Sequence, residues 1–175
     1  EEVLSIKRGA NVFSAVGCAT CHIPTLKIQD TIFREPSRHP AYRDDKFPAG
    51  LDPVSMGVDP RTPIKFDMTW DQPDNRMHDS AGNVTMRLGA LRKDAQGRGV
   101  VDLYGDLKRH NMGAGLAEAI DEVGTGASVF LTRNLWGVGS TAPYLHDGRA
   151  TTLTEAILAH GGEGAPSRTA FGRLA

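Results

Sequence analysis

Apolar residues recur at helical spacing in two stretches of this chain, one near each end. In residues 1–17 they predict a short helix with one apolar side, which Gly17 is suited to end. Residues 24–99 show little periodicity and many prolines, which predicts ordered loop with at most short strands near residues 64–68 and 84–88. The apolar positions of the first helix are Val3, Leu4, Ile6, Ala10, Val12 and Phe13.

The second periodic stretch begins at Thr152, which has Glu155 three positions later, a capping-box pattern that predicts a helix start. Four positions at i, i+3, i+4 and i+7 then share one helix face, and two glycines after the fourth predict the helix end. His160 is therefore expected on the buried side of the last helix. The shared face consists of Leu153, Ala156, Ile157 and His160.

Between these helices the pattern is weaker. Residues 100–103 resemble a strand, residues 115–123 a short helix, and residues 129–138 are apolar enough to belong to the core. The 20 glycines, 10 prolines and few aromatic residues predict a loop-rich fold. Such a fold needs an organising body besides its own side chains, and a large apolar cofactor in the core would serve.

Length and charge exclude several classes of protein. A chain of 175 residues suits one domain with a modest core, and it begins at Glu1, which favours a processed or excised piece of a longer chain. The 20 basic and 21 acidic residues leave no surplus of positive charge for nucleic acid. No apolar run approaches the roughly 18 residues of a membrane helix, so we expect no membrane span.

Residues 18–22, Cys-Ala-Thr-Cys-His, form a C-x-x-C-H motif, which is typical of c-type haem attachment. The spacing lets Cys18 and Cys21 add to the two vinyl groups along one porphyrin edge, while His22 coordinates the iron. A zinc half-site would need a second cysteine pair, and a thioredoxin-like pair would open a helix in a βαβ unit. Neither context is present, so the motif predicts one covalent haem c, attached in the periplasm or outside the cell.

The second axial ligand stays open on the residues alone. His39 and His78 lie among charged loop residues, whereas His110 and Met112 share a polar stretch that suits a ligand-bearing loop. His146 and His160 are the remaining histidine candidates.

Several motifs resemble those of the di-haem oxidoreductases, also described as thiol oxidoreductases, which are related to bacterial di-haem cytochrome c peroxidases. The likeness covers nearly the whole chain, and its C-terminal half is the specific part. The matching stretches are residues 17–24 (GCATCHIP), 104–113 (YGDLKRHNMG), 135–139 (LWGVG), 141–150 (TAPYLHDGRA) and 154–163 (TEAILAHGGE).

The resemblance implies a fold and a role. Members of the family carry two c-haems in two cytochrome domains, one haem reactive and the other relaying electrons. With one C-x-x-C-H motif, this chain resembles the C-terminal, electron-relaying domain. We therefore expect residues 1–175 to form a single c-type cytochrome domain of a larger di-haem protein, mainly α and cytochrome c-like, with long ordered loops and little β. The implied partners are a second haem domain or subunit and a redox partner protein.

The resemblance also implies a distal ligand. His160 falls where the peroxidases place the methionine ligand of the relaying haem, which makes His22 and His160 the expected iron ligands and Met112 the rival. Bis-histidine iron is saturated and lower in potential, which suits electron relay. The peroxidases further imply Ca²⁺ at the backbone carbonyls of Thr141 and Pro143, with a metal-free turn as the alternative.

Two functions follow as expectations. The first is one-electron transfer by a relay domain, and the alternative is an enzyme whose own haem acts on peroxide, oxygen or a thiol. A third, non-redox hypothesis is a binding module that the haem stabilises and that docks on a larger complex. Asp147 and Arg149 are expected to form an ion pair with each other or a contact with a haem propionate.

Overall fold

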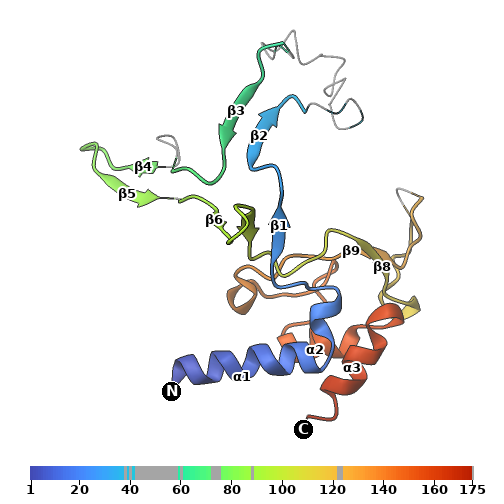
Figure 1. Ribbon diagram of the computed structural model, residues 1–175. Helices are drawn as coiled ribbons and strands as arrows, with labels where there is room; N and C mark the ends of the chain where they lie inside the picture. Colours follow the sequence, from blue (N-terminus) through green and yellow to red (C-terminus); the bar gives the residue numbers. More distant parts are fainter. Residues whose placement is uncertain are drawn as a thin grey trace. The chain divides into compact units, whose positions relative to one another are not determined.

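The computed structural model describes residues 1–37, 39, 41, 59, 61–71, 76–87, 89–121 and 124–174. The chain divides into two compact units (Figure 1). Unit 1 consists of Glu1–Leu26 and Asp102–Ala175, and unit 2 of Lys27–Val101. The C-x-x-C-H motif therefore folds with the C-terminal half of the chain, although about 75 residues separate them in sequence. One cytochrome domain over residues 1–175 stays a prediction.

Unit 1 contains every α-helix of the described residues, together with one β-hairpin and several 3₁₀ turns. No helix in the described part of the chain is both long and apolar enough to cross a membrane. The elements are α1 (Glu2–Ala15), η1 (Cys18–Thr20), β8 (Arg109–Asn111), η5 (Ala114–Leu116), β9 (Val129–Leu131), η6 (Val138–Ser140), α2 (Leu153–Ala159), η7 (Gly162–Gly164) and α3 (Ala165–Phe171). Strands β8 and β9 pair antiparallel.

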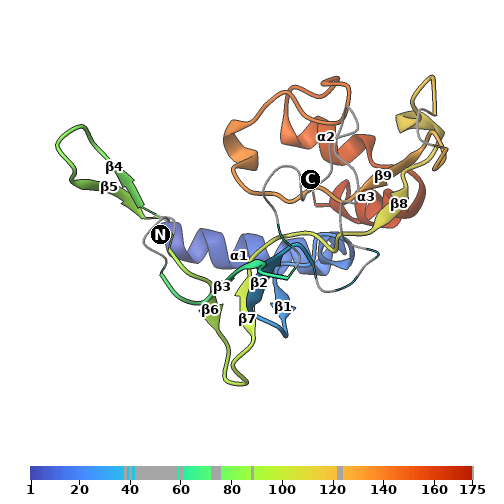
Figure 2. The same cartoon turned by 90° about the horizontal axis from the view of Figure 1, so that it is seen from above.

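The predicted first helix is confirmed as α1, but its apolar side is not buried. No residue of α1 is buried, and Ile6 is 65% exposed. Figures 1 and 2 show why: the N-terminal half of α1 extends away from α2 and α3, and only its C-terminal end lies beside them. That end brings the ring of Phe13 to 6.5 Å from the ring of His22.

The predicted capping box at the start of α2 is confirmed. The Thr152 hydroxyl accepts the Glu155 N–H at 3.2 Å, and the Glu155 carboxylate accepts the Thr152 N–H at 3.0 Å. The helix is shorter than expected, because it ends at Ala159 and His160 is its C-cap residue with φ −60° and ψ 118°. Helix α3 was not predicted, although Pro166 in its first turn is a typical start signal.

Strands β1 to β7 lie in residues 26–101. A three-stranded sheet has the order β1-β7-β6, and two antiparallel pairs join β2 with β3 and β4 with β5. Two strands, β3 and β5, lie where short strands were expected, and β7 begins just before the strand-like residues 100–103. The bounds are β1 (Leu26–Ile28), β2 (Ile32–Glu35), β3 (Ile64–Asp67), β4 (Arg76–His78), β5 (Val84–Arg87), β6 (Arg92–Lys93) and β7 (Gly99–Val101).

Two turns of the same kind close the hairpins β4–β5 and β6–β7. In the first, the Asp79 carboxylate accepts the N–H groups of Ala81 and Asn83, at 2.9 and 2.8 Å. In the second, Asp94 repeats the arrangement with Gln96 and Arg98. Hydrogen bonds from Arg98 and from backbone N–H groups outweigh the opposing effect of burial and lower the pKa of Asp94 to about 2.

The prediction of a mainly α fold is wrong. The described residues form three α-helices and nine short strands, so the fold is mixed α and β. The strands have two to four residues each, which is too short for alternation to show in the sequence, and their pairing depends on turns and partners. Most prolines that suggested loop, including Pro48 and Pro53, lie outside the described residues.

The structure corrects two further expectations. The helix expected at residues 115–123 is a single 3₁₀ turn, η5, and residues 122–123 lie outside the described residues. Residues 129–138 do not form a buried core, since Trp136 is 59% exposed. The buried apolar residues of the described chain are few: Val16, Val100, Leu116, Ala150 and Ala156.

Backbone packs directly on backbone where β8 meets η7. A Cβ atom added to Gly161 would lie 2.7 Å from the carbonyl oxygen of Met112, and one added to Gly162 would overlap the carbonyl oxygen of Asn111. Gly162 also has a positive φ of 48°, which side chains rarely adopt. The two glycines that were expected to end a helix therefore allow the chain after His160 to press against residues 111–113.

We predict that Gly162→Ala destabilises the protein by about 2 kcal/mol, because the added methyl group must displace the Asn111 carbonyl and strain the backbone. Chemical denaturation of the two proteins would measure the difference. Gly139→Ala is the matched control, because its Cβ would meet no atom within 4 Å. Equal losses in the two variants would contradict the close packing.

Candidate haem-binding site

The motif cysteines lie at a turn that α1 and α3 hold in place. Gly17 ends α1 with a φ of 89°, and a Cβ at this position would lie 2.9 Å from the Ser167 hydroxyl of α3. The 3₁₀ turn η1 follows at once and carries Cys18, with Cys21 directly after it. Both thiols are half-buried, and they form no disulfide. The pair is thus presented from one short turn, as attachment to one cofactor edge requires.

The surroundings of the thiols do not favour the two alternatives to haem. Burial raises the pKa of Cys18, and burial followed by the charges of Asp106 and Glu163 raises that of Cys21. A thioredoxin-like pair requires the opposite, a lowered thiol pKa. For zinc, the part of the chain that the structure describes holds no group of three or more His, Cys, Asp or Glu residues placed to bind a metal ion.

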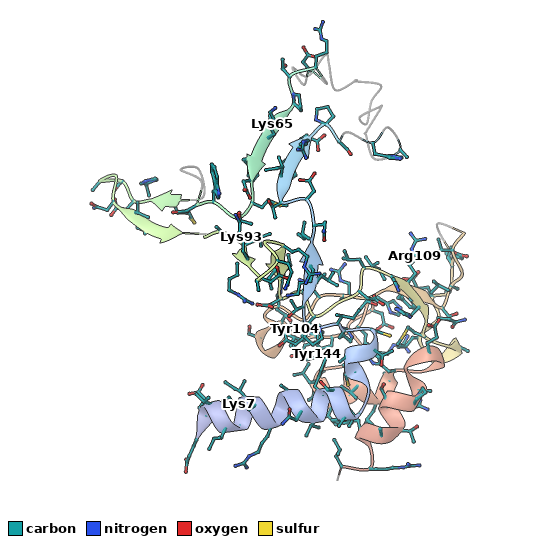
Figure 3. All side chains as sticks on the ribbon, viewed as in Figure 1. Lys7, Lys65, Lys93, Tyr104, Arg109 and Tyr144 are labelled. Atoms are coloured by element: carbon teal, nitrogen blue, oxygen red, sulfur yellow. The ribbon has the colours of Figure 1, made fainter. Side chains whose placement is uncertain are left out.

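His22 is oriented by a hydrogen bond from its ring to the backbone. Its Nδ1 donates to the Tyr104 carbonyl oxygen at 3.1 Å, and Figure 3 labels Tyr104 above α1. Two backbone bonds hold the same segments together: the Tyr104 N–H donates to Pro24, and the Gly105 N–H donates to Ile23. With Nδ1 protonated, a neutral ring carries its lone pair on Nε2, the atom a metal would take.

The charge state of His22 suits a metal ligand. Burial lowers the pKa of His22, and His160 lowers it further, against the opposing hydrogen bonds to the backbone of Tyr104 and Arg133. The imidazole is therefore neutral at neutral pH and keeps the Nε2 lone pair.

His160 is oriented in the same way as His22. Its Nδ1 lies 2.7 Å from the carbonyl oxygen of Ala156, one turn back in α2, and the ring is half-buried. Donation from Nδ1 to this carbonyl leaves Nε2 with the lone pair. His22 and His160 thus share one feature, an Nδ1 atom within hydrogen-bond distance of a backbone carbonyl oxygen.

Met112, the rival distal ligand, lies beside His160. A Cβ atom added to Gly164 would lie 3.1 Å from the methyl carbon of Met112 and 3.2 Å from Cβ of His160. Both side chains therefore approach the same glycine of η7. Position alone does not separate the two candidates, but only His160 shows the backbone-anchored ring that matches His22.

His110 has no nitrogen left for a metal. Its Nε2 lies 2.9 Å from the Asp106 carboxylate and its Nδ1 lies 2.8 Å from the Glu163 carboxylate. We name this cluster, which consists of Asp106, His110 and Glu163, the carboxylate–histidine bridge. Sequence reasoning missed it, because 53 residues separate His110 from Glu163 and no local pattern joins them.

The ionisation of this bridge follows from its contacts. Hydrogen bonds to Glu163 and then to Asp106 raise the pKa of His110. Burial raises the pKa of Asp106, whose side chain is 4% exposed, but hydrogen bonds from the Lys108 N–H and from His110 outweigh it and lower the pKa to about 2. The two carboxylates therefore favour the protonated form of the His110 ring that lies between them.

The remaining candidates lie elsewhere. His146 stacks on Phe130 of β9, with ring centroids 4.5 Å apart and an angle of 24° between the rings.

Arg149 forms an ion pair with Asp147, which was one of the two contacts expected for these residues. It also donates a hydrogen bond to the Gly115 carbonyl at 2.7 Å. His78 lies on β4 and His39 in unit 2. Calcium binding by Thr141 and Pro143 stays a prediction.

The donor set fits a c-type haem. Two neighbouring thiols, Cys18 and Cys21, match the two vinyl groups of one porphyrin edge. The imidazoles of His22 and His160 would serve as the two protein ligands of its iron, and each has one ring nitrogen hydrogen-bonded to a backbone carbonyl, as is usual for metal-binding histidines.

The comparisons with known proteins find a family match in the C-terminal half of the chain. No curated protein and no solved structure matches the chain. The family model described as "Di-haem oxidoreductase, putative peroxidase" matches residues 84–175, which include Met112 and His160 and follow the C-x-x-C-H motif. Because this match covers more than half of its length, the chain belongs to the di-haem oxidoreductase, putative peroxidase family.

Proposed function

We propose that this chain relays single electrons through one covalently bound haem c, as a domain of a di-haem oxidoreductase. The observation that carries the proposal is the pair of imidazoles, His22 and His160, each anchored at Nδ1 by a backbone carbonyl. Two histidine ligands fill both axial positions and leave none for a substrate. When bound, the haem supplies the one-electron redox couple.

Each site residue has a separate task in this proposal. Cys18 and Cys21 hold the cofactor through thioether bonds, so it stays attached through many redox cycles. His22 and His160 bind the iron through Nε2, and the carbonyls of Tyr104 and Ala156 fix their rings. A hydrogen bond at the second nitrogen makes an imidazole a stronger electron donor and favours the oxidised metal.

The proposal implies partners and a location. An electron relay needs a second haem domain or subunit on one side and a redox partner protein on the other. Because haem is attached to C-x-x-C-H motifs outside the bacterial cytoplasm, we place the chain in the periplasm or outside the cell.

The family description favours one other function. Its words "putative peroxidase" suit a haem that itself reacts with peroxide. Oxygen and a thiol are the other substrates that such a haem could act on. That function would require one axial position to be open. It is the second candidate, because His160 has the same anchored geometry as His22.

We predict that the mature protein carries its haem covalently. Its intact mass under denaturing conditions will exceed that of the polypeptide by one haem, because both thiols form thioethers. Extraction with acidified acetone will leave the colour on the protein. Colour that moves entirely into the acetone would contradict covalent attachment, and a mass increase of two haems would contradict the single site.

We predict that His160→Ala converts low-spin iron to a high-spin or water-bound form and raises the reduction potential, because an axial imidazole is lost. Absorption and electron paramagnetic resonance spectra would measure this change. The same variant should gain hydrogen-peroxide turnover that the unmodified protein lacks, because an axial position is opened.

Met112→Leu is the matched control, since it removes the rival sulfur and keeps an apolar side chain of similar size. It should leave the iron spectrum unchanged. If Met112→Leu alters the spectrum and His160→Ala does not, Met112 is the distal ligand and the proposal is contradicted. Strong peroxide turnover by the unmodified single-haem chain would favour the second candidate.

A further inference from the structure

The segment that follows His160 is tied by one side chain to β8, the strand that ends just before Met112. Glu163, three residues after His160, accepts the Asn111 backbone N–H at 2.8 Å with one carboxylate oxygen. Its other oxygen bonds His110 Nδ1 at 2.8 Å. One carboxylate therefore holds η7 against β8 through two hydrogen bonds, and the bond to His110 is charge-assisted.

The other end of this connection is the buried carboxylate of Asp106. His110 Nε2 bonds the carboxylate of Asp106, whose side chain is 4% exposed and which also accepts the Lys108 N–H at 2.9 Å. Removing Glu163 would leave His110 with Asp106 and with the Cys21 Sγ, 3.8 Å from its Nδ1, and would remove the side-chain bonds that join η7 to β8. The carboxylate–histidine bridge thus fixes η7 to the interior of unit 1.

The bridge acts on the place where the two rival ligands meet. Met112 follows β8 by one residue, His160 precedes η7 by two, and both side chains approach Gly164. The glycines between them allow backbone contact, since a Cβ on Gly161 would lie 2.7 Å from the Met112 carbonyl oxygen. A small shift of η7 along β8 would therefore exchange the side chain that occupies the distal position.

We propose that the carboxylate–histidine bridge decides the distal ligand, by holding His160 in place and keeping the Met112 sulfur off the iron. This inference rests on the proposed function, because it requires an iron bound between His22 and His160. Glu163 and His110 do not touch the metal in this account and are positioning residues. They act by fixing the position of η7 against β8.

The test compares Glu163→Ala with the unmodified protein after haem loading. The variant should show the sulfur-to-iron charge-transfer band of a methionine ligand in a fraction of the molecules, together with a higher reduction potential. Cyanide should also displace the distal ligand of the oxidised iron on the order of tenfold faster, because charge-assisted hydrogen bonds that hold His160 in place are lost. Adding Met112→Leu to the variant should abolish the sulfur band and leave high-spin iron in that fraction of the molecules.

Two further variants separate this effect from a general loss of stability. Glu118→Ala removes an exposed carboxylate from the same unit and should change neither spectrum, potential nor cyanide rate. Glu163→Gln keeps the side-chain size and an oxygen that can accept the Asn111 N–H. It therefore replaces Glu163→Ala as the test variant if Glu163→Ala does not fold. It should also speed cyanide binding, because His110 loses one of its two anionic partners.

The outcomes distinguish the two proposals. If the unmodified protein lacks a bis-imidazole spectrum, the proposed function fails. If His160→Ala behaves as proposed but both Glu163 variants keep the unmodified spectrum, potential and cyanide rate, only the role of the bridge is overturned. A lowered melting temperature with no spectroscopic change would likewise show a purely structural role.

Discussion

Both imidazoles of the candidate site are anchored by a hydrogen bond from Nδ1 to a backbone carbonyl, and the rest of the arrangement depends on this constraint. A neutral imidazole has one N–H and one lone pair, so occupying Nδ1 as a donor leaves Nε2 as the metal-binding atom. For His22 the acceptor, Tyr104, is 82 residues away, and for His160 it is Ala156, one helical turn back. The site therefore exists only when distant segments of the chain fold together.

This constraint explains the division of the chain. Residues 23–24 and 104–105 are joined by backbone hydrogen bonds, which bring the C-x-x-C-H motif to the C-terminal half despite the intervening unit 2. Unit 2 begins at β1 and ends at β7, and these strands are neighbours in one sheet. An inserted segment whose two ends lie side by side adds residues without separating the segments that flank it.

Local signals in the sequence were sufficient for the elements that depend on near neighbours. The periodicity before Gly17 predicted α1, and Thr152 with Glu155 predicted the capped start of α2. The motif at residues 18–22 named the cysteines and the first histidine from its spacing alone, and their binding of haem stays a prediction. The family resemblance, confirmed over residues 84–175, drew attention to His160.

What the sequence did not reveal depends on long-range contacts or on very short elements. Strands of two to four residues have no readable alternation, so the fold was wrongly expected to be mainly α. The bond between His110 and Glu163 spans 53 residues and leaves no local pattern. The close backbone contact at Gly161 and Gly162 resembles a helix end in sequence, because glycine serves both purposes.

The most direct test of the account is the low-temperature electron paramagnetic resonance and near-infrared spectrum of the oxidised, haem-loaded protein. Together these spectra identify both axial ligands without any substitution. The account predicts low-spin iron with two imidazole ligands and no sulfur-to-iron charge-transfer band. A methionine signature, or mainly high-spin iron, would contradict the assignment of His22 and His160 as the pair that holds the iron.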